Sequence, residues 1–196
     1  MDYTVFKQKG EGTMVYFDKP GKQNTERTLQ LAVQAAKEEG IGALVVATGS
    51  GYTPLLLKGA AKELDIVVVT HANGYREPGE QELPAQVRRE LQDCGMAIVT
   101  ATHVLSGAER GISKKFSGAY PVEIMAHTLR MFGQGTKVCV ECAVMALDCG
   151  AIRPGPVVCV GGTGRGADTA WILRPAHAAN ILDTKLDRLI CKPLLP

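Results

Sequence analysis

Short runs of continuously apolar residues recur along the chain, and most of them are followed by a polar loop and then by a helical pattern. The clearest runs cover residues 13–17, 43–47, 66–70, 97–100 and 156–160. A run without alternation indicates a strand that is covered on both faces, as in a parallel sheet. The alternation of strands and helices therefore predicts a three-layer α/β/α fold with a mostly parallel, doubly wound sheet.

Helical patterns lie between these runs. They cover residues 25–39, 54–63, 84–95, 122–132 and 137–149, and a short helix is expected within residues 103–135. We expect Asn24 or Thr25 to cap the first helix. Thr53 should cap the second, with Pro54 as its first residue.

A further apolar run at residues 169–174 follows the previous strand after a loop of glycines. The loop is too short for a crossover helix, so this run is predicted to be an antiparallel final strand. Residues 181–192 are expected to add a small terminal element. Because no linker or low-complexity tract divides the sequence, residues 1–196 are predicted to form a single domain.

Composition excludes several classes of protein. The net charge of +2 requires no polyanionic partner, and the basic clusters lack the interleaved aromatic residues typical of nucleic-acid binding. No run approaches the roughly 18 apolar residues of a membrane span. The opening residues have no apolar signal core, which favours a cytoplasmic protein. The sequence leaves the choice between a monomer and a homo-oligomer open.

The cysteines and histidines show no metal-ligand spacing, so no metal is expected. The six cysteines are scattered, and the Cys139-Val-Glu-Cys142 pair lies inside an apolar helical pattern. That setting favours packed thiols over a redox or zinc site.

In an open parallel sheet, ligands bind beyond the carboxyl ends of the strands. The strongest candidate there is the loop Thr48-Gly-Ser-Gly-Tyr-Thr53. Its glycines let backbone N–H groups converge, its hydroxyls add donors, and a following helix adds partial positive charge. The predicted contacts are Thr48, Gly49, Ser50, Gly51, Tyr52 and Thr53. The loop is not a dinucleotide or P-loop fingerprint.

A second glycine loop, residues 161–168, reaches the same edge of the sheet. This loop has two interpretations. It is a hairpin turn that uses glycine for its positive φ angles, or its backbone N–H groups form a phosphate-binding nest assisted by Arg165. The remaining candidate contacts are Asn24, Thr25, His71, His103, Gly162, Thr163, Gly164, Arg165, Gly166 and Asp168.

Residues 43–53, leading through a helix to residues 65–70, resemble the start of the carboxyl-terminal domain of pyruvate kinase. The loop at residues 161–169 before a reversed strand resembles that domain's last hairpin. With the motifs at residues 19–25 and 105–110, the chain is more closely similar to a family of small stand-alone proteins of this fold, largely from archaea with some bacterial members.

The resemblance implies a regulatory type of domain, which in pyruvate kinase holds a phosphorylated sugar between these two loops. It also implies FMN as a cofactor, because the small family is associated with bound FMN. We expect a protein that binds FMN or another phosphorylated small molecule. An FMN-dependent oxidoreductase, with His71, His103 or Glu141 near the flavin or substrate, is the alternative. No pyruvate kinase activity is expected, since the catalytic barrel takes about 250 residues.

Overall fold

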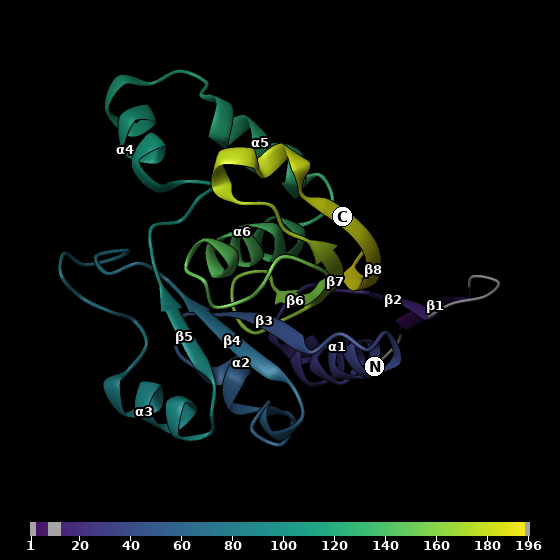
Figure 1. Cartoon of the computed structure of the whole chain (residues 1–196). Coiled ribbons are helices and arrows are strands. Elements are labelled where there is room, and N and C mark those ends of the chain that lie inside the picture. Colours follow the sequence, from purple (N-terminus) through teal and green to yellow (C-terminus); the bar gives the residue numbers. More distant parts are fainter. Residues whose placement is uncertain (1–2, 8–12, 195–196) are drawn as a thin grey trace.

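A computed structural model describes residues 3–7 and 13–194. The opening residues, for which no signal core is predicted, lie partly outside the described residues. The described residues form one sheet in the order β1-β2-β8-β7-β6-β3-β4-β5 (Figure 1). Its strands are β1 (Tyr3–Lys7), β2 (Thr13–Phe17), β3 (Ala43–Thr48), β4 (Asp65–Thr70), β5 (Ala97–Thr100), β6 (Val157–Gly161), β7 (Thr169–Arg174) and β8 (Lys185–Pro193).

The predicted fold class is confirmed. Strands β6, β3, β4 and β5 pair in parallel, β2 pairs in parallel with β8, and β7 runs antiparallel to both of its neighbours, β6 and β8. The reversed strand predicted at residues 169–174 is therefore present, but it is not the last. Strand β8 follows it, where only a small terminal element was expected, and fills the position between β7 and β2.

Helices cover both faces of the sheet. They are α1 (Thr25–Glu38), α2 (Tyr52–Leu55), α3 (Ala85–Asp93), α4 (Gly107–Phe116), α5 (Pro121–Arg130) and α6 (Gln134–Asp148). One apolar cluster joins α1 and α3 to β-strand residues such as Val46 and Val68. A second joins α5 and α6 to Val45 and Val67 on the other face. Figure 1 shows α1, α2 and α3 below the sheet and α4, α5 and α6 above it.

One predicted helix start is wrong, and at another the position is right but the predicted capping bond is absent. The helix expected at residues 54–63 is divided: α2 begins at Tyr52 after Gly51 in a left-handed conformation (φ 89°) and ends at Leu55, and a short 3-10 helix follows at Ala60–Lys62. Thr53 lies inside α2 and is not its cap. Helix α1 begins at Thr25 as predicted, with Asn24 at the N-cap position, but neither side chain bonds to the helix N-terminus: that of Asn24 donates to Lys19 O and that of Thr25 donates to Lys22 O. Both side chains instead order the loop before α1.

Among the described residues, no helix combines the length and the apolar character that crossing a membrane requires.

Candidate functional site

The carboxyl ends of the parallel strands carry loops that contact one another. Loop 48–53 meets the loop that follows β4: a Cβ placed on Gly49 would lie 3.7 Å from His71 Cε1. Beneath it, a Cβ on Gly51 would collide with Val87 and lie 2.9 Å from Leu83 Cδ1. Glycine is needed at position 51 for its positive φ and for this close packing. The loop is thus held tightly between β3 and the segment leading into α3.

Within loop 48–53, some of the hydrogen-bonding groups predicted to contact a ligand are already hydrogen-bonded or buried within the protein. The Gly51 N–H donates to Thr48 Oγ1 at 2.9 Å, and Thr53 is buried. Ser50 is exposed. Because α2 has only four residues, its dipole adds less than a full helix would. Binding of an anion here would depend on exposed hydroxyl and backbone groups and on nearby cations.

Loop 161–168 is tied to the loop before α1 through two buried side chains. Asp168 Oδ2 accepts the N–H groups of Gly21 (2.9 Å) and Thr163 (3.2 Å). Thr25 Oγ1 accepts the N–H of Ala167 at 3.0 Å. Asp168 and Thr25 are fully buried, so they join the two loops and position the backbone around the edge.

Cations lie on the outer side of these loops. Lys22 Nζ stands 4.0 Å from the centre of the Tyr52 ring, which joins the loop before α1 to loop 48–53. Lys22, Tyr52 and Arg27 help to line a hollow of about 450 Å³ beside α1. Arg165 is exposed at the tip of its loop, and no described residue forms an ion pair with it.

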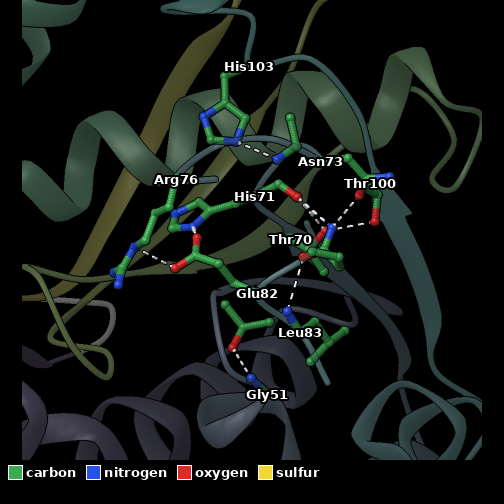
Figure 2. Close-up of polar contacts among 12 residues, drawn as sticks. Gly51, Thr70, His71, Asn73, Arg76, Glu82, Leu83, Thr100 and His103 are labelled. Carbon is green, nitrogen blue, oxygen red and sulfur yellow. Dashed lines mark hydrogen bonds and ion pairs between the residues drawn. The ribbon is translucent and has the colours of Figure 1, made fainter. Parts of the chain in front are cut away.

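Three aromatic rings gather on the other side of loop 48–53. His71 stacks on Tyr75 with 4.0 Å between the ring centroids, and His103 lies 5.5 Å from His71 and 5.4 Å from Tyr75. We call His71, Tyr75 and His103 the ring cluster. Figure 2 shows the two histidines as neighbours, with His103 above His71 in this view. The two histidines predicted for the site are therefore brought together, by β4 and β5.

Hydrogen bonds set the orientation of each histidine. His71 Nδ1 bonds to Glu82 Oε2, while the other oxygen of Glu82 accepts from Arg76 Nε at 2.7 Å (Figure 2). His103 Nε2 accepts the N–H of Ala72 at 3.3 Å, so a neutral ring carries its proton on Nδ1. Burial lowers the pKa of His103, with the nearby His71, Lys137 and Arg110 acting in the same direction and Glu141 opposing them.

A buried ion pair in α6 supports this arrangement. Lys137 Nζ bonds to Glu141 Oε2 inside α6, and each side chain is only 6% exposed. Glu141 Oε1 also accepts the N–H of Leu105 at 3.0 Å, which anchors the loop that carries His103. Because a buried charge is costly without a partner, the pair and the backbone bond act as one unit.

Sequence reasoning missed Tyr75, Glu82 and Lys137. The first two lie in a polar stretch without regular spacing, so their proximity to His71 follows only from the fold. The Lys137–Glu141 spacing was visible but is also typical of a surface pair on a helix.

The predicted packing of the thiols at Cys139 and Cys142 is confirmed, since both are buried. Within the described ranges, no three His, Cys, Asp or Glu side chains gather as a metal site.

In a comparison with known protein families, the family model described as pyruvate kinase, alpha/beta domain, matches residues 26–173. The matched segment runs from α1 into β7, and so includes loop 48–53, the ring cluster and loop 161–168. Strands β1, β2 and β8 lie outside it.

Proposed function

Because the chain belongs to the family of the pyruvate kinase alpha/beta domain, we propose that it binds a phosphorylated small molecule at the carboxyl edge of its sheet. FMN is the first candidate. The phosphate would lie on loop 48–53 with help from Arg165, and the ring system would lie against the ring cluster. Family membership supports the location, and FMN is proposed because of the resemblance to the small stand-alone family, with which the residues at this edge are compatible.

The observation that carries the proposal is the proximity of Gly49 to His71, which lies 3.7 Å from where a Cβ on Gly49 would be. It places a glycine- and hydroxyl-rich loop directly against a stack of aromatic rings. A loop of this kind suits a phosphate, because bare backbone and hydroxyl groups can approach its oxygens closely. Tyr75 is 45% exposed, which leaves ring surface for a planar ligand. FMN combines one phosphate with one planar ring system, so the residues present fit it.

Removing the loop hydroxyls tests the phosphate subsite. We expect the Ser50→Ala/Thr53→Ala variant to bind FMN at least about tenfold more weakly, or roughly 1.4 kcal/mol. Flavin fluorescence titration measures the affinity. Since Thr53 is buried, urea unfolding must first show that the double variant is folded, and Ser50→Ala alone serves as the variant with no buried change. Unchanged FMN affinity in the folded double variant would falsify this placement of the phosphate.

The role of Arg165 has a matched control in Arg153, an exposed arginine that precedes β6 at the opposite edge of the sheet. Arg165→Ala is expected to weaken FMN binding by about tenfold, because a charge-assisted hydrogen bond contributes roughly 1.5–3 kcal/mol. Arg153→Ala should leave the affinity unchanged. Equal effects of the two substitutions on the Kd would show that only net charge matters and would remove Arg165 from the site.

One observation favours the oxidoreductase alternative. His103 is held neutral by burial and by its bond from Ala72, so its Nδ1–H is a fixed donor beside the other rings. FMN would supply the redox chemistry, and His103 would orient a carbonyl or ring nitrogen. Bleaching of the flavin absorbance by NAD(P)H, followed by turnover with an added acceptor, distinguishes an enzyme from a carrier. Dithionite serves as the control reductant. If dithionite bleaches the bound FMN but NAD(P)H does not, and no acceptor is turned over, the protein binds FMN without acting as an oxidoreductase.

A further inference from the structure

Helix α4 and the segment that follows it expose apolar side chains at the outer margin of the molecule (Figure 1). No residue of α4 is buried, and the helix packs mainly against α5. Phe116, the last residue of α4, is 68% exposed, and Met131 at the end of α5 is 74% exposed. The other large apolar side chains exposed between residues 112 and 132 are Ile112, Ile124 and Phe132. Scattered exposed apolar residues are ordinary, but this many within one segment indicate a contact surface.

Polar contacts hold α4 beside α5. Glu109 Oε1 accepts the N–H of Glu123 at 2.9 Å, and the Ser113 hydroxyl donates to Glu123 Oε1 at 2.7 Å. Ile112 and Phe116 lie four residues apart, and so on the same side of the helix. A helix as short as α4 gains most of its stability by packing an apolar side against a neighbour. The exposed apolar side of α4 therefore calls for a partner outside the chain.

The turn after Phe116 points to the same need. Among the described residues, Ser117 is the one residue other than glycine with a positive φ (60°), and its ψ is −179°. This backbone conformation is strained for a residue that has a Cβ, and it persists where surrounding contacts hold it in place. Ser117 and both of its neighbours in the sequence are exposed. A partner that covers Phe116 would supply such contacts.

A hollow of about 490 Å³ lies just past this turn. Its lining includes Gly118 and Ala119 from the turn and Glu123, Ile124 and Met131 from α5 and its end. It is thus largely apolar, with one carboxylate. Glu123 Oε1 is engaged by Ser113, whereas no described residue hydrogen-bonds to its Oε2.

The exposed ring and the hollow carry opposite charges. Lys115 Nζ lies 5.5 Å from the centroid of the Phe116 ring, and no described residue forms an ion pair with this lysine. Glu123 gives the hollow its negative charge. A protruding aromatic ring beside a lysine is therefore complementary, in shape and in charge, to an apolar hollow that contains a carboxylate. Because one segment carries both halves of this match, the partner that fits it is a second copy of the chain.

We propose that residues 112–131, which we call the α4–α5 elbow, form the interface of a symmetric dimer in which Phe116 of each chain enters the hollow of the other. In a two-fold interface, each contact between two different residues occurs twice with the chains exchanged. The ring and the hollow adjoin, so one axis between them fills both hollows. Lys115 of each chain then faces Glu123 of the other. The inference does not depend on the proposed function.

Sedimentation equilibrium of the whole protein over a concentration series measures the Kd of the dimer. We expect the unmodified protein to reach twice the mass of one chain. Phe116→Glu should raise the Kd at least about tenfold, because it replaces a buried ring with a carboxylate that faces Glu123. Leu56→Glu is the matched control and should leave the Kd unchanged. Leu56 is also an exposed apolar residue (44%), but it follows α2 on the other side of the sheet (Figure 1). Circular dichroism checks that both variants are folded.

Two charge reversals test the symmetry of the interface. Lys115→Glu and Glu123→Lys should each associate weakly alone, since like charges then face each other in both contacts. An equimolar mixture of the two variants should recover the association, because each contact again joins a lysine to a glutamate. Recovery in the mixture also separates a lost contact from a folding defect in either variant.

A protein that stays monomeric up to its solubility limit overturns the inference. If that monomer floats with anionic phospholipid vesicles and Phe116→Glu does not, the elbow binds a lipid surface and not a second copy. A dimer that Phe116→Glu leaves intact, or that Leu56→Glu weakens as strongly, also overturns the inference by placing the interface elsewhere. A mixture of the charge-reversed variants that associates no better than each variant alone rules out the reciprocal contact between Lys115 and Glu123.

Discussion

Gly166 and Gly164 lie in the same loop and are glycines for different reasons. Both have positive φ angles, +73° and +75°. A Cβ on Gly166 would collide with Thr25 Oγ1 and lie 2.8 Å from the backbone of Lys22, whereas a Cβ on Gly164 would meet nothing within 4 Å. Position 164 needs only the left-handed conformation, while position 166 is also where two loops of the site touch.

This difference predicts two unequal substitutions. Gly164→Ala should lower the free energy of unfolding by about 1 kcal/mol through backbone strain alone. Gly166→Ala should cost roughly 3 kcal/mol, because overpacking is added to the same strain. Urea unfolding measures both. Equal losses of unfolding free energy in the two variants would mean that the backbone near Lys22 moves to accommodate the added methyl group without destabilising the fold.

His103 makes stability depend on pH. Burial lowers its pKa in the folded protein, so the unfolded chain binds a proton more readily as the pH falls from about 7 to about 5. Acidification across this range should therefore destabilise the fold. In His103→Gln, which keeps an acceptor for Ala72 N–H but cannot titrate, the loss of unfolding free energy between these two pH values should be smaller. If His103→Gln loses as much unfolding free energy between these pH values as the unmodified protein does, titratable groups other than His103 cause the pH dependence.

At the scale of elements, α6 differs most from a generic covering helix. It fills one face of the sheet with small apolar side chains and yet buries the Lys137–Glu141 pair. Glu141 also holds the backbone of Leu105, so the helix fixes the position of the loop after β5. The pair thereby links the apolar cluster between α6 and the sheet to the ring cluster at the edge of the sheet.

The buried pair predicts strong coupling between its members. Glu141→Gln should lower the free energy of unfolding by roughly 3–5 kcal/mol, since it leaves Lys137 buried without a countercharge. Adding Lys137→Met should recover much of that loss. Glu63→Gln, which breaks the exposed Lys37–Glu63 pair, should cost less than about 1 kcal/mol. Chemical denaturation of the unmodified protein, Glu141→Gln, Lys137→Met and the double variant gives the double-mutant cycle. Strictly additive losses would show that the two side chains are not coupled.

For the molecule as a whole, two apolar clusters enclose the sheet, and most thiols lie within them. Cys139, Cys142, Cys159 and Cys191 are buried, Cys94 is half-buried and Cys149 is exposed. Burial raises the pKa of the Cys191 thiol to about 12 and also raises the pKa values of the other three buried thiols. A buried thiol with little thiolate is a poor nucleophile.

Alkylation with a maleimide should therefore modify Cys149 first and Cys94 more slowly, with the buried four reacting only after unfolding. Mass spectrometry with and without urea gives the order. Modification of Cys139 or Cys142 at the rate of Cys149 in the folded protein would contradict the closed packing of α6 against the sheet.

Local patterns were sufficient for the elements whose residues carry the signal themselves. The apolar runs at residues 43–47 and 66–70 became β3 and β4 nearly to the residue, because strands covered on both faces need no polar alternation. The helix predicted at residues 54–63 became the α-helical turn α2, a series of turns and a short 3-10 helix at Ala60–Lys62, because the backbone hydrogen bonds after Leu55 mostly span three residues and not four. Strand β8 was missed as a strand, because its pattern is partly polar and its pairing partners, β7 and β2, are distant in sequence.

The sequence by itself determined the α/β class, the reversal after the loop at residues 161–168, and the glycine loops at the carboxyl edge, because periodicity and loop length are local properties. Only the tertiary structure decided that Gly49 lies against His71, that Glu82 orients this histidine, and that Glu141 holds the loop carrying His103. These contacts join residues from different strands and loops. Their geometry depends on how the sheet aligns its strand ends, and no spacing along the chain encodes that alignment.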